Sequence, residues 1–167
     1  MDSLNIGLSS WIIRDGNYGD FSVGQKTEFA LEFYPHSVQA SDCRSPSATH
    51  LDKNVYQICA QVVYRTNRLW VLDMGFLAYN EMEPPPFAEK GSWVKGEFSI
   101  GIDPFMYFEY LKNRSGMPNL TYRFRIDQIF IETNESYAEV AETNAWGDNN
   151  GSANYILKCV SIDGRIR

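Results

Sequence analysis

Hydrophobic and polar residues alternate through long parts of this chain, and the alternation predicts β-strands. It is clearest in residues 28–33, 56–64, 91–102 and 122–126, and the last expected strand covers residues 155–162. Successive side chains of a strand point to opposite faces, so a period of two places the hydrophobic ones on one buried face. The expected structure is therefore a set of half-buried strands.

Short polar breaks divide these runs. Thr66-Asn67 separates residues 56–64 from a second run at 68–72, which predicts a hairpin. Residues 73–75 include a glycine within a strand pattern, and this favours a bulge or bend. The prolines at 84–86 lack amide donors, so we expect an extended connector there. The apolar register slips near Gln128, where a bulge would fit.

Three segments are less regular. Residues 35–54 are polar and aperiodic, which predicts a long surface loop that is either functional or hides a short element. Residues 105–111 are apolar on both faces, so they fit a buried strand or one helical turn equally well. Asn134 is expected to cap a short helix, because apolar residues follow at helical spacing over residues 137–141.

Together these elements predict one mainly β domain over residues 1–167, an antiparallel β-barrel or sandwich with one or two short helices. A hydrophobic content of 44%, with 14% aromatic residues, is ample for its core. A strand, a hairpin, a loop and then a strand carrying Gly91, Val94 and Gly96 resemble the order of an OB-type barrel. The resemblance covers residues 55–102 and implies a barrel of that kind.

Charge and cysteine content narrow the choice of partner and compartment. The formal net charge of −6 disfavours generic binding to nucleic acid or to an anionic membrane, and it favours a basic protein partner. No apolar run is long enough to span a membrane, and no signal peptide is visible, so we expect a cytoplasmic protein. Cys43, Cys59 and Cys159 are widely spaced, which predicts reduced thiols. The oligomeric state stays open.

Catalytic and metal motifs are weak. His36, Cys43 and His50 share one polar segment, but their irregular spacing favours solvated loop residues over a metal site. Lone carboxylates such as Glu97 and Asp103 fit a solvated strand face better than acid–base catalysis. We therefore predict no metal, no cofactor and no catalytic residue. An enzyme with a dispersed site is the third alternative, and a deep polar pocket with convergent ionisable groups would identify it.

An acidic tract is the strongest functional feature. The segment from Asp127 to Asp148 contains six carboxylates, its two end residues included, and no Lys or Arg lies between Arg125 and Lys158. Such charge beside aromatic anchors suits a basic partner. The first hypothesis is therefore a non-catalytic binding domain that docks a protein partner in an inhibitor, immunity-like or adaptor role. Its predicted contact residues are Glu132, Glu135, Tyr137, Glu139, Glu142, Trp146 and Asp148.

The second hypothesis is an OB-like binder of single-stranded nucleic acid. Proteins of this kind combine guanidinium groups with aromatic side chains that stack on bases. Alternation places the aromatic residues on the face opposite the arginines, which favours a solvated polar face instead. The residues concerned are Arg65, Arg68, Trp70, Arg123 and Arg125.

Overall fold

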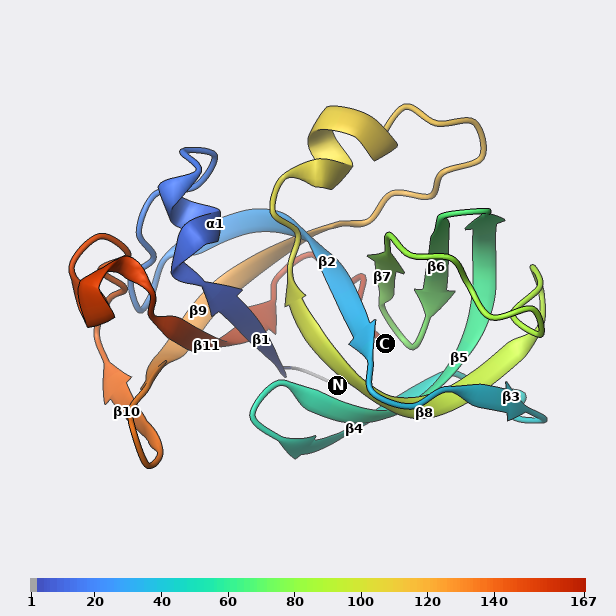
Figure 1. Ribbon diagram of the computed structural model, residues 1–167, viewed down its shortest axis with the longest axis horizontal. Helices are drawn as coiled ribbons and strands as arrows, with labels where there is room; N and C mark the ends of the chain where they lie inside the picture. Colours follow the sequence, from blue (N-terminus) through green and yellow to red (C-terminus); the bar gives the residue numbers. More distant parts are fainter. Residues whose placement is uncertain (1–2) are drawn as a thin grey trace.

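Strands dominate the computed structural model, which describes residues 3–167 (Figure 1). In this range eleven strands pair into one sheet. Their bounds are β1 Ser3–Ser9, β2 Lys26–Pro35, β3 Gln39–Ser41, β4 Ser47–Asp52, β5 Val55–Thr66, β6 Leu69–Asp73, β7 Leu77–Asn80, β8 Trp93–Ile102, β9 Thr121–Glu132, β10 Tyr137–Val140 and β11 Asn154–Ser161. The helices of the described chain are short: α1 Ser10–Arg14, the π-helix η1 Tyr107–Leu111 and the 3₁₀-helix η2 Asp148–Gly151.

Eight of the strands in residues 3–167 close into a barrel. The ring runs β2, β9, β11, β1, β8, β5, β6, β7 and back to β2, and each strand pairs with the next. Most pairs are antiparallel, whereas β1–β8 and β2–β7 are parallel. Of the barrel and the sandwich that the sequence predicted as alternatives, the structure has the barrel. Residues 55–102 supply four consecutive strands of the ring, which holds eight strands where an OB barrel has about five.

Strands β2 and β8 also pair with each other and lie at the centre of the molecule. Residues Leu31–Pro35 of β2 run antiparallel to Phe98–Ile102 of β8. Figure 1 shows β1, β9 and β11 on one side of this central pair and β5, β6 and β7 on the other. Because β8 pairs with both β1 and β2, it connects the two sides directly.

The interior is a single aromatic-rich cluster that contains residues from Leu4 to Cys159. The ring of Phe33 stacks on Phe98 and meets Trp70 edge-on, each at a centroid distance of 5.2 Å. These offset and edge contacts are the geometries that aromatic quadrupoles favour. The alternation therefore places the rings inward, as the sequence predicts.

A second, smaller cluster covers part of the barrel's outer surface. Helix η1 packs Tyr107 and Leu111 over Ala30 of β2 and Val71 of β6. Strand β2 is consequently buried on both faces at its centre, rather than on one face as expected for residues 28–33. The same helix resolves the ambiguity at residues 105–111 in favour of helix.

Residues 35–54 are not one long loop, because the short strands β3 and β4 lie there; this confirms the alternative that the segment hides a short element. Both strands are largely exposed and polar, so they carry no hydrophobic alternation. The helix expected after Asn134 is instead strand β10, which pairs with the end of β9. A tight turn, closed by a 2.7 Å hydrogen bond from Thr133 N to Ser136 O, takes the place of a helix cap.

Other local predictions were confirmed. Strands β5 and β6 form the expected hairpin, and the register of β9 against β11 shifts beside Gln128, as a bulge requires. Gly75 adopts φ = 97° in the bend between β6 and β7, a conformation that favours glycine. Among the described helices, none is long and apolar enough to cross a membrane.

Candidate binding groove

One row of outward-facing positions runs in register across six neighbouring strands. It can be traced because Leu4, Ile6 and Leu8 of β1 point into the core, which places Gly7 on the outer face. Directly paired residues of neighbouring strands share a face. From β10 to β2 the row reads Glu139, Phe130, Ile156, Gly7, Gly101 and Glu32.

The outer surface is hollowed at the middle of this row. Gly7 pairs with Gly101; the amide of Asn54 occupies the space that a side chain at Gly7 would need, whereas the position of a side chain at Gly101 is open. The resulting hollow has a volume of about 260 Å³, and Trp11, Glu32 and Tyr34 are among its lining residues. Trp11 is 51% exposed, so a large aromatic surface borders this hollow.

A second hollow continues the first towards β10. It has a volume of about 500 Å³ and shares Glu132, Tyr137 and Ile156 with the first one. We call the two together the outer groove. Glu32 lines one end of it, and the β9–β10 hairpin lines the other. This is a concave polar site of the kind the sequence could not reveal.

Glu32 is the most unusual ionisable group in the groove. Its residue is only 9% exposed, and burial raises the pKa of its carboxyl from 4.5 to about 7. The hydroxyl of Tyr34 donates a hydrogen bond to Glu32 Oε1, which lowers that pKa in part. The carboxylates of Asp103 and Glu81 raise it further by repulsion. Glu32 is therefore a buried carboxyl without a cationic neighbour to stabilise its ionised form.

Asp103, whose charge acts on Glu32, is itself fully buried. Tyr79 Oη donates to Asp103 Oδ1 at 2.5 Å, and the Tyr107 amide reaches both carboxylate oxygens at 3.2 Å. Burial raises the pKa of Asp103, while these hydrogen bonds counteract the rise. Burial and the nearby carboxylates also raise the pKa of Tyr79 above its ordinary value. Two carboxyls and a tyrosine thus share one enclosed polar cluster.

The far end of the groove carries most of its exposed charge. Glu132 Oε2 accepts a hydrogen bond from Asn154 Nδ2 at 3.0 Å, which orients this carboxylate. Asp52 and Glu135 also line this end, and the only lining cation in the described chain is Lys53. The ammonium of Lys53 lies 5.4 Å from the centre of the Tyr137 ring. The groove as a whole is therefore strongly acidic.

The structure divides the predicted acidic set. Glu132, Glu135 and Tyr137 line the groove, and Glu139 lies at the end of the row. Trp146 lies outside the groove lining, is 66% exposed and lies 5.0 Å from the Arg14 guanidinium carbon.

The two other members of the set have local contacts of their own. Asp148 accepts a 2.7 Å hydrogen bond from Tyr155 Oη, which holds the loop before β11. Glu142 forms an isolated bridge with Ser22. Four residues of the predicted set therefore share the β9–β10 hairpin, whereas the other three, Glu142, Trp146 and Asp148, lie outside it.

The arginines and tryptophan considered for nucleic-acid binding do not form one surface. Trp70 is 1% exposed and donates through Nε1 to Asn80 Oδ1, so it offers no face for stacking. Arg65 donates to the backbone carbonyls of Pro85 and Ala88, which anchors the proline connector. Arg68 lies in the β5–β6 turn and Arg123 on β9.

Arg125 also lies on β9, where it pairs with Asp127 at 2.8 Å. Of the predicted set, Arg68, Arg123 and Arg125 therefore remain exposed, the first in the β5–β6 turn and the other two on β9. The only aromatic residue of that set, Trp70, is buried and cannot stack beside them.

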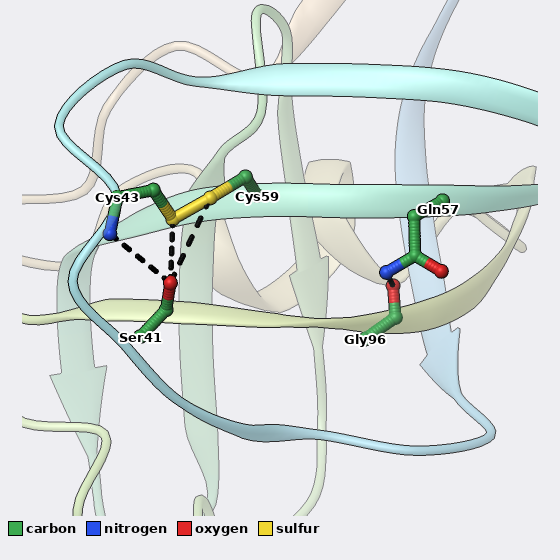
Figure 2. The surroundings of a disulfide bond; sticks show 5 residues. All are labelled: Ser41, Cys43, Gln57, Cys59 and Gly96. Carbon is green, nitrogen blue, oxygen red and sulfur yellow. Dashed lines mark hydrogen bonds between the residues drawn. A yellow bond between two sulfur atoms is a disulfide. The ribbon is translucent and has the colours of Figure 1, made fainter.

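The expectation of reduced thiols was wrong for two of the three cysteines. The chain after β3 brings Cys43 beside Cys59 of β5, with their Cα atoms 6.6 Å apart, and the two form a disulfide (Figure 2). Cys159 is free and buried in the core. Figure 2 shows Ser41 against the same bond, with its Oγ 2.8 Å from Cys43 Sγ.

The two histidines considered with Cys43 are engaged elsewhere. His36 Nε2 contacts Ser99 Oγ at 2.5 Å, and His50 Nε2 contacts Lys53 O at 2.8 Å. Across residues 3–167, no group of three or more His, Cys, Asp or Glu side chains is placed to hold a metal ion.

Comparison with protein-family models, with curated proteins and with solved structures finds no match to this chain. The class that the geometry defines is a closed β-barrel with an acidic groove on its outer face.

Proposed function

We propose that this chain is a non-catalytic binding module that docks a basic segment of a protein partner in the outer groove. The observation that carries the proposal is the charge of the lining: among residues 3–167 it contains four carboxylates and one cation, Lys53, and the carboxylates are those of Glu32, Asp52, Glu132 and Glu135. An acidic concave surface steers a basic partner during approach and repels an acidic one. The net charge of −6 acts in the same direction.

The shape of the groove favours an extended segment. From β9 to β2 it crosses four strand spacings, which is roughly 19 Å along the sheet. An extended peptide rises about 3.3 Å per residue, so some six residues would fill this length. Trp11 and Tyr137 would supply the aromatic contacts that anchor such interfaces.

The cellular compartment of the protein bears on this proposal. A cytoplasmic setting is the expectation from the sequence, and the Cys43–Cys59 disulfide counts against it, because such bonds persist mainly in oxidising compartments. Docking on the groove does not depend on this choice, since neither cysteine lines it.

The test uses fluorescein-labelled hexapeptides that differ only in charge, one rich in Lys and Arg and one rich in Glu. We expect fluorescence anisotropy to show binding of the basic peptide alone, weakening as salt is raised. The double variant Glu132→Gln/Glu135→Gln should bind about five- to tenfold more weakly. Glu89→Gln/Glu109→Gln is the matched control, because it removes the same charge from exposed positions outside the groove. Equal binding of the acidic peptide, or equal loss in the control, would overturn the proposal.

A further inference from the structure

We propose that the glycine-floored end of the outer groove is a pocket for one ammonium or guanidinium group, with Glu32 as its counter-ion. The inference rests on the proposed function for the source of that group, which is a Lys or Arg side chain of the basic segment. It goes further by assigning the specificity of docking to one carboxylate.

The floor of the pocket is formed by Gly101, which leaves open space, and by its partner Gly7, over which the Asn54 amide lies. Glu32 is the next residue of the row and pairs directly with Gly101, so no side chain of that row separates the glycine floor from its carboxyl. Trp11 and Tyr34 also line this hollow. Aromatic faces beside a carboxylate form the usual surroundings of a bound organic cation, because the ring quadrupole attracts positive charge.

Glu32 has no counter-ion among residues 3–167. A buried carboxylate is normally paired with a cation or fully hydrogen-bonded. Within residues 3–167 the ion pairs join Arg125 to Asp127 and Arg167 to Asp73, and neither includes Glu32.

The groups that act on Glu32 from the surrounding elements are also without positive charge. Asp103 and Glu81 are carboxylates, and Tyr34 and Tyr79 contribute hydroxyls. Tyr18 adds a further hydroxyl to the same cluster and donates to the backbone oxygen of Asp103. A ligand cation would supply the missing positive charge.

Binding should consequently be coupled to loss of a proton. The pKa of Glu32 is about 7, so its carboxyl is mostly neutral at pH 6 and mostly ionised at pH 8. Only the ionised form pairs with a cation, and apparent affinity scales with the fraction of that form. Affinity for an ammonium group should therefore rise about tenfold between pH 6 and pH 8, and then level off.

The experiment uses single-residue probes in place of an unknown partner. N-acetyl-lysine methylamide and N-acetyl-arginine methylamide are titrated at pH 6, 7 and 8, with amide chemical shifts followed by NMR. N-acetyl-norleucine methylamide serves as the uncharged analogue. We expect shifts at Gly7, Gly101 and Trp11 for the cationic probes, with the stated rise in affinity.

Two variants and one control test the assignment. Glu32→Gln should weaken binding at pH 8 at least tenfold and remove the pH dependence. Gly101→Ala should also weaken binding while folding normally, because its added Cβ would lie 3.5 Å from Gly7 O and 3.8 Å from Tyr34 Cε2, which are ordinary contacts. Glu28→Gln removes a charge from an exposed position of the same strand and should bind as the parent does.

The outcomes separate this inference from the proposed function. Equal binding of the norleucine analogue, or unchanged pH-dependent binding by Glu32→Gln, would overturn the pocket. If the basic hexapeptide binds and depends on Glu132 and Glu135 while the single-residue probes do not bind, the pocket fails and the proposed function stands. If the probes bind at Glu32 but the hexapeptide does not, the pocket stands and docking of a basic segment fails.

Discussion

Replacing Glu32 with Gln should change how the stability of the protein depends on pH. The carboxyl has a pKa of about 7 in the folded protein, against an ordinary value of 4.5. Well below pH 4.5 the group is protonated in both the folded and the unfolded state, so it does not change the free energy of unfolding. As the pH rises from 4.5 to 7, the unfolded chain releases the proton while the folded chain retains it, so stability falls. Glutamine does not titrate and avoids this loss.

The size of the effect follows from the pKa difference. A shift of about 2.5 units corresponds to roughly 3 kcal/mol once the pH exceeds 7. Most of that loss, roughly 2 to 3 kcal/mol, falls between about pH 5 and pH 8. Glu32 is only 9% exposed, so solvent screening reduces the value little. The raised pKa of Asp103 acts with the same sign, but it does so in both proteins and largely cancels in their difference.

Urea denaturation of the parent and of Glu32→Gln across this pH range measures the difference directly. The variant should gain roughly 2 to 3 kcal/mol over the parent between about pH 5 and pH 8. Glu28→Gln, an exposed carboxylate on the same strand, should follow the parent. Parallel curves for the parent and Glu32→Gln would refute the reasoning, because they would mean that Glu32 ionises normally in the folded protein.

Three further changes test the fold. Gly96→Ala would place a Cβ 1.9 Å from the backbone oxygen of Ser37, so we expect a loss of about 2 kcal/mol or more and a lower urea midpoint; an unchanged midpoint would contradict that packing. Reducing the Cys43–Cys59 bond, whose cysteines are 16 residues apart, should lower stability by roughly 3 kcal/mol and shift the melting temperature, whereas Cys43→Ser should not respond to reductant. Arg65→Ala removes the hydrogen bonds to the proline connector and should cost about 1 to 3 kcal/mol, with earlier proteolysis at that connector; unaltered cleavage would count against the anchor.

The barrel strands could be predicted from the sequence where one face is buried and the other is exposed to solvent. Residues 56–64 and 91–102 show this alternation because β5 and β8 line the core with every second side chain. Strand β4 has a single partner, β5, and is exposed at nearly every position, so no burial pattern marks its sequence. The apparent helical spacing after Asn134 was overridden by the Thr133–Ser136 turn, which directs the chain back along β9.

The groove was predictable only in part. The acidic hairpin is local in sequence, so its charge and its aromatic residue predicted Glu132, Glu135 and Tyr137 as binding residues, and the structure places all three in the groove lining. Glu32 occupies a polar position of an alternating strand and is indistinguishable there from a solvated residue. Its raised pKa depends on burial in the folded protein and on the charge of Asp103, which is distant in the chain, and sequence patterns contain neither. The pairing of Gly7 with Gly101 likewise depends on a register between β1 and β8 that only the folded barrel defines.

The two glycines of β8, Gly96 and Gly101, differ in whether packing requires them. Gly96 is required by packing, because the backbone at Ser37 occupies the space of any side chain. Gly101 has no such constraint: a Cβ would fit, and its φ is not in the positive range, so alanine would be tolerated and would avoid the roughly 0.5 to 1 kcal/mol that glycine costs within a strand. Beside it, the buried carboxyl of Glu32 is a second feature that lowers stability at neutral pH. Local features that a fold does not need, placed next to one another in one hollow, are expected where a site has a function.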